Sequence, residues 1–185
     1  MTSTYVLGID MGTGSARAGV FDLQGHQLGI GSADWATTHP RSGWAEQNPE
    51  QWWQSVVTAV RDALTSSRVR PEHIRAISMD ATSSTVVVLD DQDQVLRPAL
   101  LWMDVRAVEE AEQIRATNQE ALRLAGNGPV SAEWGLPKSM WIKKHEPQIF
   151  ERAAVICDET DWLVNRLTGQ WTMSVAHAAG KYFYD

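Results

Sequence analysis

The sequence is short of several features that would assign a protein to a particular compartment. Its 185 residues include one cysteine, Cys157, which excludes an internal disulfide framework and favours a reducing compartment. No apolar run approaches the roughly 20 residues needed to span a bilayer. The first residues, MTSTYVLGID, lack the basic and then apolar layout of a secretory signal. We therefore expect a cytoplasmic protein that makes no contact with a membrane.

Positive charge and metal-ligand patterns are scarce as well. The formal net charge is −7, whereas a surface that neutralises a nucleic-acid backbone needs a basic stripe. The five histidines and the single cysteine show no spacing typical of metal ligands. We therefore expect no nucleic-acid partner and no histidine or cysteine metal site.

Tryptophan, in contrast, is abundant. Nine tryptophans are scattered along the chain, and most of them are expected to fill a core or an interface. A flat aromatic ring also covers the C–H face of a carbohydrate well. A sugar-binding role therefore stays open for individual tryptophans.

Hydrophobic periodicity and helix-start signals predict an α/β fold. The helix start at Asn48-Pro49 combines an N-cap residue with a proline at the first helical position. The predicted strands span residues 5–9, 16–21, 27–32, 74–79, 85–89 and 155–157. The predicted helices span residues 49–66, 105–125 and 137–145, and a last helix runs from a capping Asp158 to Gly169. We find no internal repeat and no linker.

The stretch GIDMGTGSARAGVFD, residues 8–22, has the composition of a phosphate-binding loop. It lacks the third glycine of a dinucleotide fingerprint and the G-K-[ST] of a P-loop, and the residues after Gly14 alternate like a strand. The loop should therefore join two antiparallel strands, where backbone N–H groups and the hydroxyls of Thr13 and Ser15 form an anion nest. Asp10 could hold Mg²⁺ through water. A plain glycine-rich hairpin with a capping aspartate remains the alternative.

Two later segments carry clusters of polar groups. DATSST, residues 80–85, follows a buried strand, where side chains point into a crevice, although these residues also form turns readily, and Asp80 is expected to be structural. In LWMDVRA, an extended backbone would place Trp102, Asp104 and Arg106 on one side. An acid, a base and a ring on one face suit sugar hydroxyls and carbons. The alternative is a surface Asp–Arg pair, worth less than about 1 kcal/mol, beside a core tryptophan.

Taken together, these segments resemble the FGGY carbohydrate kinases. The glycine loop is similar to the first phosphate motif of that family, and GWAEQNPEQWW, ISMDATSSTVVVLD, LLWMDVRA, EWGLPK and ETDWLVNRLTG follow in family order. The pattern E-W-x-x-P-K with a later D-W resembles the ribulokinase-like branch. The resemblance implies an actin-like ATPase (ribonuclease-H-like) domain with a mixed sheet flanked by helices, incomplete in this chain.

The resemblance also implies roles for individual residues. ATP and Mg²⁺ would be the cofactors, with Asp10 near the metal ion and the transferring phosphoryl group. The residues implied in binding the nucleotide phosphates are Gly12, Thr13, Gly14, Ser15 and Arg17. The residues implied in binding the sugar are Thr82, Ser83, Trp102, Asp104, Arg106, Glu133 and Lys138. For Lys138, a solvated position in the first turn of a helix is the alternative.

The family's catalytic base has no counterpart in this sequence. In FGGY kinases it is an aspartate late in the first of two similar domains, and the adenosine-binding motifs lie in the second domain. We therefore interpret residues 1–185 as the N-terminal part of the first domain, with no catalytic residue assigned and the second domain absent. The missing strand would leave an open sheet edge, which is a route to aggregation.

The sequence thus favours the N-terminal part of an ATP-dependent kinase that phosphorylates a terminal hydroxyl of a ketopentose, with ribulose as the first choice. Such a chain is expected to be inactive alone and to need the missing C-terminal kinase domain. A non-catalytic sugar-binding or regulatory module remains the main alternative. A structural member of the actin-like group is a third reading, against which the sugar-type segments speak. The oligomeric state is left open, with a homodimer as one option.

Overall fold

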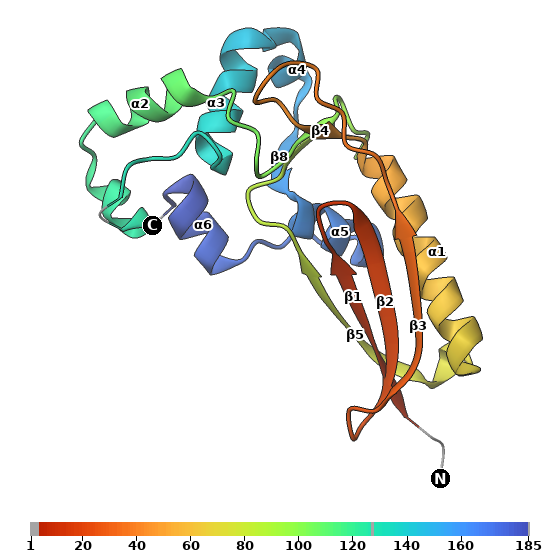
Figure 1. Ribbon diagram of the computed structural model, residues 1–185. Helices are drawn as coiled ribbons and strands as arrows, with labels where there is room; N and C mark the ends of the chain where they lie inside the picture. Colours follow the sequence, from red (N-terminus) through yellow and green to blue (C-terminus); the bar gives the residue numbers. More distant parts are fainter. Residues whose placement is uncertain (1–3, 127, 185) are drawn as a thin grey trace. The chain divides into compact units, whose positions relative to one another are not determined.

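The computed structural model describes residues 4–126 and 128–184. Two compact units make up the chain, and neither is continuous in sequence. Unit 1 comprises residues 1–36 and 50–82, and unit 2 comprises residues 37–49 and 83–185. Figure 1 shows the secondary structure along the chain.

Unit 1 is a four-stranded mixed sheet with one long helix. Its elements are β1 (Tyr5–Met11), β2 (Ser15–Asp22), β3 (Gln27–Asp34), α1 (Pro49–Ser67), the 3₁₀ helix η1 (Pro71–His73) and β5 (Ile74–Ala81). The strand order is β3-β2-β1-β5. β1 pairs antiparallel with β2 and parallel with β5. The predicted order of three strands, a helix and a strand is therefore confirmed.

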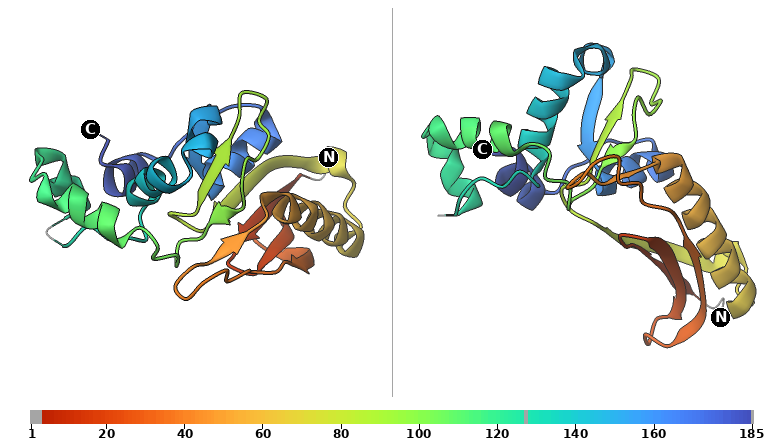
Figure 2. Two further views of the ribbon diagram at one scale, coloured as in Figure 1. Left: turned by 90° about the horizontal axis from the view of Figure 1, so that it is seen from above. Right: turned by 45° about the horizontal axis from the view of Figure 1, so that its top comes forward.

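Alternation along the strands explains which face of this sheet is covered. Leu7, Ile9 and Met11 of β1 are buried, whereas the residues between them are only half-buried. On β3, Gly29 and Gly31 lie directly against the backbone of α1. Figure 2 shows α1 beside the strands of unit 1 from two further directions. The apolar face of the sheet thus packs on α1 at a separation that only glycine allows on β3.

Gly31→Ala is therefore expected to destabilise the chain by about 3 kcal/mol or more. The added Cβ atom would meet backbone atoms of α1, which cannot move aside as a flexible side chain can. A Cβ atom at Gly31 would overlap the carbonyl oxygen of Ala59 and lie 2.6 Å from the Cβ atom of Asp62. Chemical denaturation measures the free energy of unfolding. Gly180→Ala is the matched control, because a Cβ atom at this position within helix α6 meets no atom within 4 Å. Equal stability of the two variants would contradict this packing.

β5 closes one end of the strand order of unit 1. Its outer edge pairs with no other strand in the part of the chain that the structure describes. Arg75, Ala76 and Ser78 are exposed, and Ile77 keeps 52% of its surface accessible. β5 is therefore one of the two edge strands of this sheet, with β3 at the other end.

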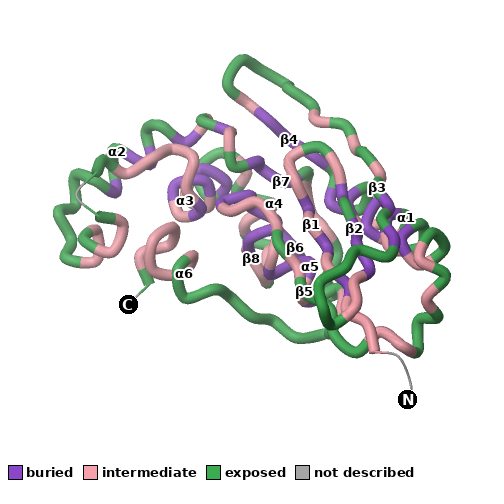
Figure 3. The backbone as a smooth tube through the Cα atoms, turned by 60° about the horizontal axis from the view of Figure 1, so that its bottom comes forward, coloured by how far each residue is buried: buried purple, intermediate pink, exposed green. Residues whose placement is uncertain are grey.

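Unit 2 combines a small antiparallel sheet with short helices. Its strands are β4 (Glu46–Gln47), β6 (Val86–Leu89), β7 (Ala99–Leu100) and β8 (Val155–Asp158), in the order β4-β7-β6-β8. Its helices are α2 (Val108–Ala116), the 3₁₀ helix η2 (Glu120–Ala125), α3 (Gly135–His145), α4 (Pro147–Arg152), α5 (Glu159–Thr168) and α6 (Val175–Tyr182). Every residue of β6 is buried, as Figure 3 shows, and Leu100, Trp141 and Ile142 pack in the same core.

The predicted helix over residues 105–125 is wrong in its extent. The structure has α2 to Ala116, a break, and the 3₁₀ helix η2. Asn118 in the break adopts a φ of +50°, and the Thr117 hydroxyl donates back to the carbonyl oxygen of Ile114. Asparagine tolerates the left-handed region, and threonine competes for backbone hydrogen bonds.

Among the described residues, none of the helices has the length and apolar character needed to cross a membrane.

Candidate functional site

The glycine loop of unit 1, residues 12–14, is a tight connection between antiparallel strands, as the sequence predicted. The Gly12 N–H donates to the carbonyl oxygen of Ser15 at 3.0 Å. Trp35, at the end of β3, donates from its indole Nε1 to the Thr13 carbonyl at 3.1 Å and from its backbone N–H to the Gly14 carbonyl at 3.0 Å. Two loop carbonyls are therefore turned towards Trp35, which fixes the loop's conformation.

Asp10 and Arg17 face each other at the loop end of the hairpin. They are partners in the β1–β2 register, and an Arg17 guanidinium nitrogen lies 2.8 Å from an Asp10 carboxylate oxygen. About half of each side chain is accessible, 47% for Asp10 and 56% for Arg17. On the other side of β1, Asp80 of β5 is the register partner of Asp10. One arginine and two aspartates thus meet where β1 and β5 end.

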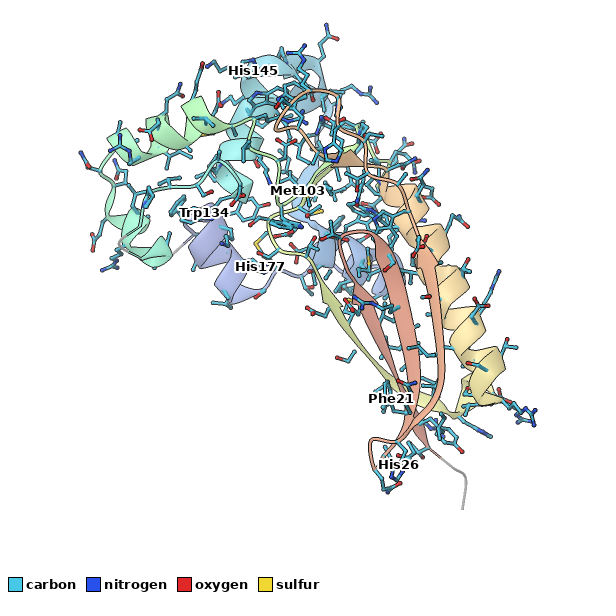
Figure 4. The ribbon with its side chains drawn as sticks, in the orientation of Figure 1. Phe21, His26, Met103, Trp134, His145 and His177 are labelled. Carbon is cyan, nitrogen blue, oxygen red and sulfur yellow. The ribbon has the colours of Figure 1, made fainter. Side chains whose placement is uncertain are left out.

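A shallow depression of about 310 Å³ lies beside these charges. Gly8 and Gly19 are register partners, and the ring of Phe21 lies against both of them. Figure 4 labels Phe21 on β2. Asp10, Arg17 and Asp80 also line the depression. Sequence reasoning missed Phe21 here, and it assigned Asp80 a structural role. Strand alternation places Gly8, Asp10, Arg17 and Gly19 on one face, and this pattern could have indicated the depression.

The charges and space at this end of the sheet fit a phosphate bound with Mg²⁺. A Cβ atom on Gly14 would meet no atom within 4 Å, so the backbone there is open to close approach. Mg²⁺ is usually bound through one or two carboxylates plus phosphate oxygens and water, and Asp10 and Asp80 are register partners. In the described ranges, no group of three or more histidine, cysteine or acidic side chains could hold a metal ion. Asp10 and Asp80 are therefore the two carboxylates at this end of the sheet that could hold Mg²⁺ together with phosphate oxygens.

In unit 2, Asp104 is buried and its carboxylate is fully occupied. One oxygen, Oδ2, accepts the Ala45 N–H at 2.7 Å and a guanidinium N–H of Arg106 at 2.8 Å. The other, Oδ1, accepts the backbone N–H and the Nε–H of Arg106 at 3.0 and 2.9 Å. The Asp104 N–H donates to Leu101 in a turn. The expected extended backbone is therefore wrong, because residues 101–104 form a turn.

Arg106 is equally buried. Its side chain has no accessible surface, and its guanidinium lies 3.7 Å from the ring centre of Trp44 and 4.8 Å from that of Trp141. It also lies 2.8 Å from a carboxylate oxygen of Glu46. The surface Asp–Arg pair considered from the sequence is therefore wrong, since the pair lies in the core of unit 2. A direct sugar contact by Asp104 or Arg106 stays a prediction, and their observed partners are protein groups.

Lys138 of α3 is buried as well, so the solvated position considered from the sequence is wrong. Its ammonium donates to the carbonyl oxygens of Ser84 at 2.8 Å, Leu101 at 2.5 Å and Trp102 at 3.4 Å. Burial lowers the pKa of Lys138 to about 7, and the nearby Asp104 and Asp158 carboxylates partly oppose that shift. Sugar contact by Lys138 also stays a prediction.

The remaining sugar candidates are more accessible. Trp102 keeps 39% of its surface exposed, and Ser83 and Glu133 are half-buried. The Ser83 hydroxyl lies 3.5 Å from that of Ser84, and Glu133 accepts from the Ser131 hydroxyl at 3.4 Å. Thr82 is half-buried and ends the part of the chain assigned to unit 1. Ser83, Trp102 and Glu133 are therefore the sugar candidates of unit 2 with accessible surface.

Asp158 caps α5, as the sequence predicted, and Asp161 completes the capping box. Sequence reasoning missed a second set of contacts, because the Asp158 carboxylate also accepts the N–H groups of Ser84 and Thr85 at 2.9 and 3.0 Å. His177, labelled on α6 in Figure 4, lies 3.4 Å from the same carboxylate. Burial raises the pKa of Asp158 above its ordinary value. In the sequence Asp158 indicates only the start of a helix, but in the structure its carboxylate also binds the backbone of the distant turn at Ser84 and Thr85.

The fold and the glycine loop together indicate the class of protein. An antiparallel β-hairpin with a glycine loop, a third strand, a helical crossover and a strand parallel to the first form the start of an actin-like ATPase (ribonuclease-H-like) domain. The chain belongs to the FGGY family of carbohydrate kinases, whose N-terminal domain matches residues 5–185. The family predicted from the sequence is therefore confirmed.

Individual relatives agree with that assignment. The chain is 30% identical over 179 residues to the xylulose kinase of Escherichia coli, covering 97% of this chain and 36% of that protein. It is 31% identical over 185 residues to the glycerol kinase of Thermococcus kodakarensis, covering 98% of this chain and 37% of that protein. The crystal structure of xylulose kinase from Rhodospirillum rubrum superposes with a TM-score of 0.88 at 29% identity, over 98% of this chain and 37% of that one. The chain thus spans little more than a third of the length of these relatives.

Proposed function

We propose that residues 1–185 supply the phosphate loop and the sugar-orienting residues of an ATP-dependent kinase that phosphorylates a terminal hydroxyl of a ketopentose. One observation carries the proposal. The glycine loop forms a hairpin with Asp10 and Arg17 at its base, in a chain that belongs to a family of carbohydrate kinases. Phosphoryl transfer depends mainly on positioning and on charge stabilisation, and this hairpin is equipped for both.

At the glycine loop, Gly12, Thr13, Gly14 and Ser15 would bind nucleotide phosphates through backbone N–H groups and hydroxyls. Arg17 would turn from Asp10 to a phosphate, a change favoured by the exposure of both side chains. Asp10, with Asp80, would then hold Mg²⁺, which when bound neutralises negative charge on the phosphate oxygens. The open space at Gly14 lets a phosphate approach the backbone.

In unit 2, the accessible side chains would meet the sugar. Trp102 would cover carbon atoms with its ring, while Ser83 and Glu133 would bind hydroxyl groups. Thr82, the last residue of unit 1, keeps the sugar role that the family resemblance implies. Asp104, Arg106 and Lys138 would act through these residues, because each is already bonded to protein groups. Asp104, Arg106 and Lys138 would therefore have an indirect role in sugar binding.

The general base would come from outside residues 1–185. Asp10 lies beside Arg17 at the phosphate loop, which suits a metal ligand better than a base. A longer protein would also supply the second domain, as the coverage of 36% of the E. coli relative favours. In that protein, a base would take the proton of the terminal hydroxyl as the oxygen attacks the γ-phosphoryl group in line.

The substrate test compares three alcohols. The names of the relatives favour xylulose, the E-W-x-x-P-K segment favours ribulose, and the glycerol kinase match provides the third candidate. We expect ADP release with MgATP and a ketopentose from the product of the whole reading frame. The 185-residue chain alone should show no turnover and weak sugar binding in calorimetry.

Two outcomes would contradict the proposal. Robust turnover by the 185-residue chain would show that the base lies within it, and preference for glycerol would remove the ketopentose assignment. Sugar binding without ADP release by the whole product would instead support the non-catalytic binding module.

A further inference from the structure

Ser84 has a backbone conformation that serine rarely adopts. Its φ is +67°, in the left-handed region, and only 4% of its surface is accessible. For a residue with a Cβ atom this conformation costs free energy, and it persists only where the surroundings impose it. Ser84 directly follows Ser83, one of the proposed sugar ligands.

Two buried side chains of opposite charge hold the backbone of Ser84. Its N–H donates to Oδ2 of Asp158 at 2.9 Å, and its carbonyl oxygen accepts from Nζ of Lys138 at 2.8 Å. Neither charged side chain has accessible surface, and they lie 54 and 74 residues away in sequence, on α3 and at the start of α5. Both backbone polar groups of Ser84 are therefore hydrogen-bonded to buried side chains from distant elements.

The same two charges also fix the neighbouring segment with Trp102. Lys138 donates to the carbonyl oxygens of Leu101 and Trp102, while Asp158 accepts the N–H of Thr85. The Thr85 hydroxyl oxygen in turn accepts the Trp102 N–H at 3.2 Å. The turn at Ser84 and the segment at Trp102 are therefore braced to each other through one network.

We propose that Lys138 and Asp158 are positioning residues that clamp the Ser84 backbone in its left-handed conformation, and thereby set the directions of Ser83 and Trp102. The effect on sugar binding rests on the proposed function, whereas the clamp itself does not. Lys138 thus acts by holding carbonyl oxygens, and its ammonium is not directed to the sugar.

The clamp is tested in the 185-residue chain by a double-mutant cycle between Lys138→Met and Ser84→Gly. Loss of Lys138 leaves buried carbonyl groups unpaired, and we expect amide exchange at Ser84 and Thr85 to rise about 10- to 100-fold. Glycine adopts positive φ without a steric penalty. Ser84→Gly in the Lys138→Met background should therefore recover about tenfold in exchange protection, the equivalent of the left-handed penalty of an ordinary residue.

Two matched controls separate conformation from other effects. Ser84→Ala removes the hydroxyl but keeps the Cβ atom, so it should give no recovery. Asn118→Gly also replaces a residue with positive φ in unit 2, but far along the chain from the clamp, and its effect should simply add to that of Lys138→Met. If Lys138→Met does not fold, Asp158→Asn provides the second arm, since it keeps the shape and loses the charge.

Equal exchange in Lys138→Met with and without Ser84→Gly would overturn the clamp, as would recovery by Ser84→Ala. Weaker binding of xylulose or ribulose to Lys138→Met, restored by Ser84→Gly, would confirm the link to the sugar. If no variant and no parent chain binds either sugar while the cycle shows coupling, the proposed function fails and the clamp stands.

Discussion

Asp104→Ala is expected to lower the free energy of unfolding by about 3 kcal/mol, because it removes the carboxylate that binds the buried Arg106 guanidinium in two places and leaves that guanidinium with the Glu46 carboxylate at 2.8 Å. The Arg106 side chain has no accessible surface and donates to Asp104 from Nε and from a terminal nitrogen. The substitution also leaves the Ala45 N–H without its acceptor. Urea denaturation followed by tryptophan fluorescence measures the loss.

Replacing both residues separates the effect of the unpaired charge on stability from the effect of the lost side-chain volume. Asp104→Ala combined with Arg106→Met removes both charges, and it should cost less than the sum of the two single changes. Exposed Asp91→Ala is the matched control, with an expected change within about 0.5 kcal/mol. Unchanged stability of Asp104→Ala together with lost sugar binding would favour the direct sugar contact that the sequence predicted.

Asp10→Asn is expected to lower kcat by about 10²- to 10³-fold in the product of the whole reading frame, a loss typical of removing one electrostatic group from a transition state. The cause would be a weakened hold on Mg²⁺ and the phosphate oxygens. Stability should change by less than about 1 kcal/mol, because the Asp10–Arg17 pair is half exposed. Steady-state kinetics and thermal unfolding on the same preparations separate the two effects.

Asp22→Asn is the matched control for this experiment. Asp22 ends β2, the strand that Ser15 begins beside the glycine loop, and its carboxylate accepts from His26. His26 is labelled in Figure 4. The Asp22→Asn substitution should leave kcat within about twofold, since an exposed ion pair contributes little. A normal kcat in Asp10→Asn, or a loss that only follows loss of folded protein, would remove Asp10 from the proposed metal site.

Local signals were sufficient to predict most of the fold. Asn48-Pro49 gave the start of α1, and the capping pair Asp158 and Asp161 gave the start of α5. The alternation after Gly14 predicted a strand, and hence a hairpin loop instead of a dinucleotide site. These features depend on residues within one turn of each other, so they are visible in a short window of sequence.

The buried charges could not be predicted in the same way. Asp104, Arg106 and Lys138 are residue types that usually lie on the surface. Asp104 and Arg106 pair with each other two residues apart, but other partners are distant, with Ala45 59 residues from Asp104 and Ser84 54 residues from Lys138. No local pattern encodes a backbone carbonyl as the partner of a lysine. Sequence reasoning therefore nominated segments for the candidate site but did not separate accessible side chains from buried ones.

The discontinuous units have a consequence for synthesis on the ribosome. Residues 37–49 belong to unit 2 but leave the ribosome before residues 50–82, which complete unit 1. β4 at Glu46–Gln47 pairs with β7 at Ala99–Leu100, so its partner emerges some fifty residues later. At about 5–20 residues per second that delay lasts several seconds. Unit 1 is therefore complete first, with residues 37–49 held as a loop that still lacks β7, and no single cut in the chain would separate the two units with both intact.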